Sequence, residues 1–214
     1  MQQSTNGPLD RIDVFSEVPQ SAVLDDALLA RVRAGAISLR EYTLFTWALR
    51  CWHLPIEQLA WDSRSDTVKG VRPLLKRKVS LLERDLVSLC GKELVVPAEL
   101  NRTLDAFAQL TSRGTTPARM LGRLYVCENL FASLAGSAAR VETSLDLDSG
   151  ATHYLRGCSY PQAHLEDVRQ CFASALVGEV PMQNAVEGSR EASAQLQELL
   201  SLLVRLTTRQ AAAS

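Results

Sequence analysis

The chain has 214 residues, of which 46% are hydrophobic and 22% charged, a composition typical of a globular protein with one domain. The formal net charge of −1 gives no basic surplus, so a nucleic-acid-binding protein is not expected. No apolar run reaches the roughly 20 residues that a membrane span needs. The N-terminal residues lack a basic stretch followed by an apolar one, so no secretory signal is predicted.

The cysteines are spread widely along the chain, without a CxxC pair. An odd number at wide spacing is typical of reduced thiols, and not of a disulfide framework or a zinc site. The pattern predicts a cytoplasmic protein. The five cysteines are Cys51, Cys90, Cys127, Cys158 and Cys171.

The first part of the chain predicts a polar arm followed by a helix. Residues 1–20 are mostly polar and contain two prolines, so we expect a loose N-terminal arm with one short helix. A helix from about Ser21 to Ala34 follows, and Gly35 ends it. Ser38 and Glu41 then form a capping box, because each side chain can reach the other's free backbone N–H group.

The helix that this box opens carries an apolar stripe at three- and four-residue steps, and Pro55 is expected to kink it. His53 lies one position off the stripe and four residues before Glu57. A His–Glu pair within the helix, or a hydrogen-bonded histidine at the edge of the core, is favoured over a ligand-binding role. The stripe consists of Tyr42, Phe45, Leu49, Trp52, Ile56 and Leu59.

One continuous helix is expected from about Thr67 to Cys90. A basic run from Arg72 to Lys78 lies near its start, and Glu83 and Asp85 follow directly. Such a run predicts either a solvated helix face or the rim of an anion-binding site.

The second half of the chain predicts further amphipathic helices and no strand, because no segment alternates at period two for long enough. The pattern indicates an all-α fold: a single compact multi-helix domain over residues 21–209, followed by a tail at residues 210–214. A polar stretch is expected after Val141, through Gly150. The expected helices begin at Pro97, cover Leu121–Gly136, begin again at Pro161 and cover Ser189–Arg209.

The segment Leu121–Gly136 carries one acid, Glu128, on its apolar face. An unpaired carboxylate would be costly to bury there. One interpretation is a core helix whose acid finds an arginine or backbone partner. The other is a cavity wall from which Glu128 points inward.

Motifs for several enzyme classes are missing. Without GxSxG, a Walker loop or GxGxxG, the sequence gives no support for a hydrolase elbow, an NTPase or a dinucleotide-binding protein. No Glu-x-x-His pair occurs, and the three histidines lie in separate segments. A di-metal helical bundle or a histidine-rich metal site is therefore not predicted.

Five segments, taken in order along nearly the whole chain, match the pieces of one known family. They are Leu29–Tyr42, His53–Glu57 ("H-x-x-L-E"), Lys78–Gly91 ("L-x-x-D-L-x-x-L-G"), Leu121–Glu128 ("G-A-L-Y-V-L-E-G-S-x-L-G-G") and His153–Gly157. Together they resemble bacterial heme oxygenases of the biliverdin-producing kind. The resemblance implies the heme oxygenase-like all-α fold, with the ligand held between an N-terminal helix and the distal helix of Tyr125.

The departures from this family fall on the residues that would hold heme. The position of the family's heme-ligating histidine falls on Gln20, and glutamine is a poor iron ligand beside a neutral imidazole. The distal glycines, which let the helix backbone approach the porphyrin, fall on Asn129, Ser133 and Leu134. Side chains thus stand where heme would lie flat.

The candidate ligand-cleft residues are Gln20, Tyr125, Glu128, Asn129, Ser133 and Leu134. We expect a divergent heme oxygenase-like protein that does not degrade heme in the ordinary way and binds another small molecule, or a protein partner, in the former heme cleft.

Two alternatives remain. One is a heme oxygenase, converting heme to biliverdin, iron and CO, whose heme is held by an unusual axial group such as His53, His164 or a cysteine thiolate. The other is a non-enzymatic interaction or regulatory module. The sequence assigns no catalytic residue, no metal, no cofactor apart from heme in the first alternative, and no oligomeric state.

Overall fold

The computed structural model describes residues 26–89, 94–159 and 162–211. Every regular element within these ranges is helical, which confirms the predicted all-α fold. In chain order the elements are α3 (Ala27–Ala34), α4 (Leu39–Asp62), α5 (Asp66–Val71), the 3-10 turn η1 (Arg72–Leu74), α6 (Lys78–Leu89), α7 (Ala98–Ser112), α8 (Pro117–Ser133), α9 (Ala138–Leu145), the 3-10 turn η2 (Ser149–Ala151), α10 (His153–Gly157), α11 (Gln162–Ala175) and α12 (Glu179–Ala211).

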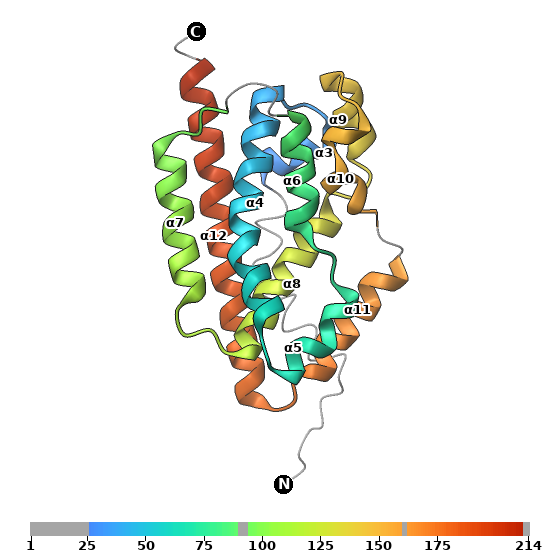
Figure 1. The fold of residues 1–214 in the computed structure, drawn as a ribbon, viewed down its shortest axis with the longest axis vertical. Coiled ribbons are helices and arrows are strands. Elements are labelled where there is room, and N and C mark those ends of the chain that lie inside the picture. The colour runs from blue at the N-terminus through green and yellow to red at the C-terminus, as the bar shows by residue number, and fades with distance from the viewer. Residues whose placement is uncertain (1–25, 90–93, 160–161, 212–214) are drawn as a thin grey trace.

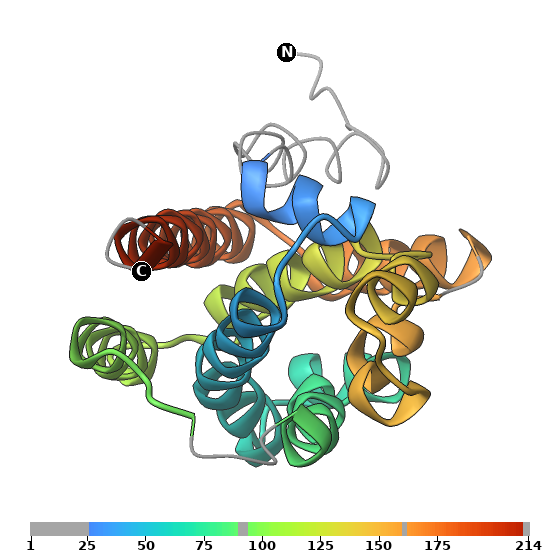
Figure 2. The same cartoon turned by 90° about the horizontal axis from the view of Figure 1, so that it is seen from above.

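Helix α8 lies at the centre of the bundle. The long helices α4, α7 and α12 run side by side with α6 along the long axis (Figure 1). Seen from above, α8 crosses the middle of the molecule between these helices and the α9–α11 side (Figure 2). It packs against α4, α5, α11 and α12. The segment that the sequence singled out is thus the helix with the most central position.

The first described helix, α3, ends where the sequence predicts. Gly35 has a φ of 71°, and an added Cβ would lie 2.7 Å from the carbonyl oxygen of Arg140. A glycine is therefore required both by the left-handed conformation and by the close approach of the 138–145 helix. At the other end, the Asp26 side chain caps the helix by accepting the N–H of Leu28. The expected arm at residues 1–20 and the expected helix start at Ser21 lie outside the described residues.

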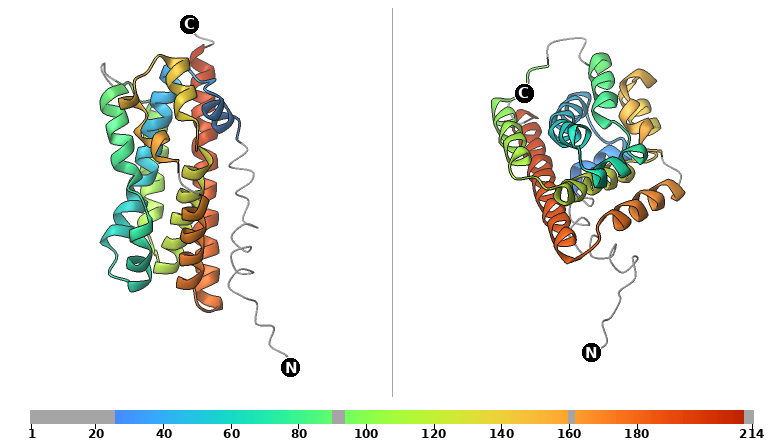
Figure 3. Two further views of the ribbon diagram at one scale, coloured as in Figure 1. Left: turned by 90° about the vertical axis from the view of Figure 1, so that its right-hand side faces the viewer. Right: turned by 60° about the horizontal axis from the view of Figure 1, so that its bottom comes forward.

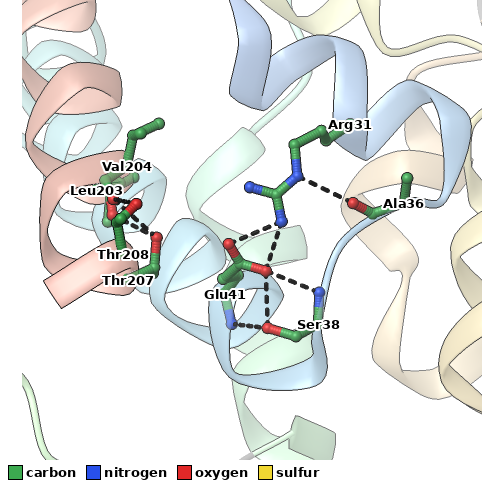
Figure 4. Close-up of polar contacts among 8 residues, drawn as sticks. All are labelled: Arg31, Ala36, Ser38, Glu41, Leu203, Val204, Thr207 and Thr208. Atoms are coloured by element: carbon green, nitrogen blue, oxygen red, sulfur yellow. Dashed lines mark hydrogen bonds and ion pairs between the residues drawn. The ribbon is translucent and has the colours of Figure 1, made fainter. Parts of the chain in front are cut away.

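The predicted capping box at the start of α4 is confirmed. The Glu41 N–H donates to Ser38 Oγ at 3.3 Å, and the Ser38 N–H donates to Glu41 Oε2 at 2.9 Å (Figure 4). The Arg31 guanidinium donates to both carboxylate oxygens of Glu41, at 2.8 and 2.7 Å. The same acid therefore caps α4 and joins it to α3. From here α4 continues as one helix through Pro55 to Asp62.

The prediction of one helix from Thr67 to Cys90 is wrong, because the chain forms α5, the turn η1 and α6 instead. Pro73 lies inside η1, where its missing N–H and fixed φ prevent a regular α-helix from continuing. Leu75 is extended, with φ −95° and ψ 135°. Arg72 also ties this break to the end of α4, since its Nε donates to the carbonyl oxygen of Ala60 at 2.9 Å. The basic run thus straddles a break and does not form one helical face.

Two later elements also differ from the prediction. The stretch after Val141 is helical as far as Leu145, and Asp146, with a φ of 51°, ends this helix. Helix α12 begins at Glu179 rather than Ser189. Pro181 lies in its first turn, where a proline removes no intrahelical hydrogen bond.

The closest helix crossing in the described structure joins α8 to the N-terminal half of α12, which run alongside each other in Figure 3. A Cβ added to Gly122 would lie 1.8 Å from the carbonyl oxygen of Ala185, and one added to Gly188 would lie 2.0 Å from that of Arg119. No side chain fits at either place, so the two backbones touch. Beside the crossing, Glu191 accepts hydrogen bonds from Arg119 and from the buried Arg123.

We expect the substitution Gly122→Ala to destabilise the protein by about 3 kcal/mol, because the new methyl group forces the two helices apart. Urea unfolding followed by circular dichroism measures this free energy. Gly70→Ala is the matched control, since Gly70 is also helical but has no atom within 4 Å of an added Cβ. The control should be neutral or slightly stabilising. Equal effects of the two substitutions would contradict the close crossing.

Candidate functional site

The central helix α8 is built by strong local signals. Thr116 caps it, with Oγ1 accepting the N–H of Arg119 at 3.2 Å, and Pro117 occupies the first helical position. The helix ends at Ser133, with Leu134 as its C-cap. These ends place Glu128 in the middle of the bundle and not at a loop.

The carboxylate of Glu128 forms a buried ion pair with Lys78, the first residue of α6. Lys78 Nζ donates to Glu128 Oε1, and each side chain is 3% exposed. The same ammonium lies 4.9 Å from the ring centroid of Phe131. Glu128 Oε2 is buried and accepts no hydrogen bond from the described residues. Of the two interpretations of Glu128, the structure therefore gives the paired acid in a core helix, with a lysine as its partner.

Lys78 is the residue that the sequence analysis missed. Its place in the basic run Arg72–Lys78 predicts either a solvated face or the rim of an anion-binding site, but the side chain is buried. A signal was present, because Lys78, Leu82 and Asp85 lie at positions i, i+4 and i+7 and so share one face of α6. All three are buried. The helical period that places the apolar Leu82 in the core therefore places Lys78 and Asp85 there as well.

A second buried polar pair joins α4 to α10. His53 is fully buried, and its Nε2 lies 3.3 Å from the hydroxyl oxygen of Tyr154, with the tautomer deciding which group donates. Burial, helped by the charge of Lys78, lowers the pKa of His53 well below its ordinary value, so the imidazole is neutral near pH 7. His53 Nδ1 finds no partner among the described residues. The Tyr154 ring packs edge-on against Phe131, with 5.0 Å between centroids, and Phe131 in turn lies beside the Lys78 ammonium.

The predicted pair between His53 and Glu57 does not form. Glu57 Oε1 instead accepts the N–H groups of Lys78 and Val79, at 2.5 and 3.1 Å, and so caps the start of α6 from another helix. The hydrogen-bonded alternative for His53 is correct in kind, but the residue lies inside the core and not at its edge.

Asp85 caps α10 in the same way. Its Oδ2 accepts the N–H of Tyr154 at 2.9 Å, and its Oδ1 lies 3.1 Å from His153 Nδ1. Burial raises the pKa of the Asp85 carboxyl, against the lowering effect of the N–H groups that it accepts. The His153 ring is thereby held beside the Asp85 carboxylate at the start of α10.

The buried cysteines have no features of reactive nucleophiles. Cys127 and Cys158 are buried, and burial raises the pKa of both thiols above the ordinary value. A buried thiol with a raised pKa stays protonated and is a poor nucleophile and a poor metal ligand. These two residues act as small core side chains.

Three candidate residues share one face of α8, at successive four-residue steps. Tyr125 is buried against Phe172 of α11, with the rings edge to face at 6.1 Å. Asn129 and Ser133 are half-buried, and Ser133 Oγ donates to the carbonyl oxygen of Leu130 at 2.7 Å. This face therefore presents an amide and a hydroxyl. Glu128 is not part of it, since its carboxylate points toward α6.

The remaining candidates are placed differently. Leu134 is fully buried and belongs to the hydrophobic core. Gln20 lies outside the described residues. The structure thus brings Tyr125, Asn129 and Ser133 together and sends Leu134 and Glu128 to the core.

The described residues contain neither a metal-ligand cluster nor a membrane-spanning helix. In the described part of the chain, no group of three or more His, Cys, Asp and Glu side chains is placed to hold a metal ion. No helix in this part has the length and apolarity to cross a membrane.

We expect Glu128→Gln to destabilise the protein by about 4 kcal/mol, because the substitution leaves the charge of Lys78 buried without a counter-charge. Urea unfolding measures the change. Replacing both partners, as Lys78→Met with Glu128→Leu, should recover most of the loss, since no buried charge remains. Glu166→Gln is the control: it removes one partner of the exposed Arg169–Glu166 pair. An effect of Glu128→Gln no larger than that of the control would contradict the buried pair.

Comparison with known proteins identifies the fold. No protein-family model and no curated protein matches the chain. Heme oxygenase-1 from the cyanobacterium Synechocystis, solved with heme, aligns with a TM-score of 0.70 at 14% identity, covering 95% of this chain and 96% of that one. Heme oxygenase-2 from the same organism, solved with heme and NO, gives 0.72 at 15% identity, covering 93% and 85%.

Two similar structures are not described as heme oxygenases. A domain of unknown function from Shewanella denitrificans, with a heme oxygenase-like fold, has a TM-score of 0.67 at 12% identity and covers 99% of this chain and 97% of its own. A TenA homologue from Pyrococcus furiosus gives 0.59 at 12% identity, covering 92% and 100%. At such identities the likeness concerns the fold alone, and neighbours with different descriptions share it. The protein has the heme oxygenase-like fold.

Proposed function

We propose that this protein is a divergent member of the heme oxygenase-like fold that binds a ligand other than heme on the Tyr125–Asn129–Ser133 face of α8. The single observation that carries the proposal is the pair of half-buried polar side chains on this face, Asn129 and Ser133. Both occupy positions where the resemblance to heme oxygenases expects glycine. A flat macrocycle needs those positions free of Cβ atoms.

The buried residues do not fit heme iron. His53 is fully buried, and its Nε2 lies 3.3 Å from the Tyr154 hydroxyl. The buried thiols of Cys127 and Cys158 remain protonated. His53 and these two thiols are therefore not available as axial ligands in place of the histidine that Gln20 replaces. The proposal therefore contains no step that involves heme.

The chemistry of the face indicates what kind of ligand suits it. The Asn129 amide carries both donor and acceptor atoms, and the Ser133 hydroxyl keeps an acceptor site after donating to Leu130. Tyr125 and its neighbour Phe172 supply aromatic surface beside them. A small molecule with hydrogen-bonding groups on an apolar body suits this combination. A protein segment bound by the same groups is the other possible occupant.

Titration with hemin tests the proposal. We expect no sharp Soret band at one equivalent of hemin and no biliverdin after addition of a reductant. A saturable 1:1 Soret complex that is turned over to biliverdin would overturn the proposal and favour a heme oxygenase. In that case, replacing the three histidines and Cys158 one at a time would identify the axial ligand.

A gain-of-binding variant makes the test stricter. The triple variant Gln20→His, Asn129→Gly, Ser133→Gly should acquire a Soret band, because it restores an imidazole and removes two Cβ atoms from the distal face. Gln20→His alone is the matched control and should bind hemin at least about tenfold more weakly than the triple variant, since the side chains still obstruct the porphyrin. Equal hemin binding by the two variants would show that Asn129 and Ser133 are not the obstruction.

A further inference from the structure

A pocket that does not involve α8 opens at the surface between α4 and the first turns of α6. Its volume is about 340 Å³. Leu54 and Val79 contribute aliphatic surface, and Trp61 contributes an aromatic wall. The Arg77 guanidinium lies 5.0 Å from the ring centroid of Trp61, in a cation–π contact. The pocket is therefore lined on two sides by surfaces that suit a hydrocarbon chain.

Carboxylates dominate the charged part of the lining. Glu57, Asp62 and Glu83 all contribute to it, against the single guanidinium of Arg77. Glu83 is 49% exposed, and its Oε1 accepts both hydrogen bonds from Arg50. Asp62 makes no side-chain hydrogen bond or ion pair with the described residues. The lining therefore carries three carboxylates against one guanidinium; Glu83 is also paired with Arg50, which leaves Asp62 as the lining carboxylate without a hydrogen-bond or ion-pair partner among the described residues.

Glu57 is the deepest of these acids. Its Oε1 is used to cap α6, where it accepts the Lys78 and Val79 N–H groups. Burial raises the pKa of the Glu57 carboxyl despite these bonds and despite the nearby charges of Lys78 and Arg77. A partly desolvated carboxylate with an incompletely compensated charge is stabilised by a cation that reaches it. Capping α6 explains one oxygen of this group and leaves the negative lining of the pocket without a role.

We propose that this pocket binds a small organic ammonium ion, with its hydrocarbon part against Leu54 and Trp61 and its charged end at Glu57 and Glu83. An anion would meet three carboxylates and is disfavoured. A bare metal ion would need converging ligands, and no such group is found in the described part of the chain. A diamine matches this lining best, because it carries two ammonium groups and the lining includes the exposed Asp62 carboxylate beside Glu57 and Glu83. This site is separate from the α8 face, so either proposal can fail alone.

Putrescine is the probe, added to the full-length protein at low ionic strength and followed by the indole N–H signal of Trp61 in heteronuclear NMR. We expect saturable shifts at this signal and little change for Trp47 and Trp52, which lie outside the pocket lining. Butanediol, of the same length but neutral, and succinate, of opposite charge, should bind at least about tenfold more weakly, because the ammonium–carboxylate attraction is lost.

Substitutions of the pocket carboxylates test whether putrescine binds at this pocket. Asp62→Asn combined with Glu83→Gln should weaken putrescine binding about tenfold, since each exposed carboxylate contributes roughly a threefold effect. Glu99→Gln, on α7 and outside the pocket, is the matched control and should leave the affinity unchanged. Circular dichroism checks that each variant is folded.

Three results would overturn the proposal. They are the absence of saturable Trp61 shifts, equal binding of butanediol, and an equal loss of affinity in the pocket variant and the Glu99 variant. The last result would mean that putrescine responds to net charge and not to this pocket.

Discussion

Neutralisation of charge inside a low-dielectric core is the constraint on which the centre of this protein depends. The Lys78 ammonium and the Glu128 carboxylate are both withdrawn from water, and neither is tolerable there without the other. The pair joins the first residue of α6 to the middle of α8. The same turn of α6 is held by a second acid, because Glu57 of α4 accepts its first N–H groups. Three helices are therefore fixed at one point by two carboxylates, and Phe131 and Tyr154 pack around that point.

Local signals account for the parts of the fold that the sequence predicted well. The Ser38–Glu41 box and Gly35 act within a few residues of themselves, so the C-terminal end of α3 and the start of α4 could be read directly. The break after α5 was misjudged because the apolar period was followed through Pro73. The early start of α12 was missed because the residues around Gly188 look weakly helical. Gly188 itself is explained by the close approach of the α8 backbone, which leaves no room for a side chain.

In the candidate site, too, local sequence signals predicted some features, and contacts between distant residues determined the others. The helical, largely apolar character of the Leu121–Gly136 segment followed from its periodicity, but the partner of Glu128 lies fifty residues earlier in the chain. No local sequence rule selects Lys78, and not an arginine or a backbone group, as the partner of Glu128. The long-range caps made by Glu57 and Asp85 were invisible for the same reason, since each acid acts on a different helix. Such contacts depend on how the helices are stacked, and the sequence pattern gives the faces of the helices but not their neighbours.

The contact between the backbones at Gly122 and Gly188 limits how the protein can respond to a ligand. Two helices in direct backbone contact, with Glu191 of α12 bonded to Arg119 and Arg123 of α8, resist being moved apart. Asn129 and Ser133 lie further along the same α8. Room for a ligand on their face is therefore gained more readily by movement of the elements that face α8 than by movement of α8 itself. Differences in ligand size among proteins of this fold would then arise mainly on the side that faces α8.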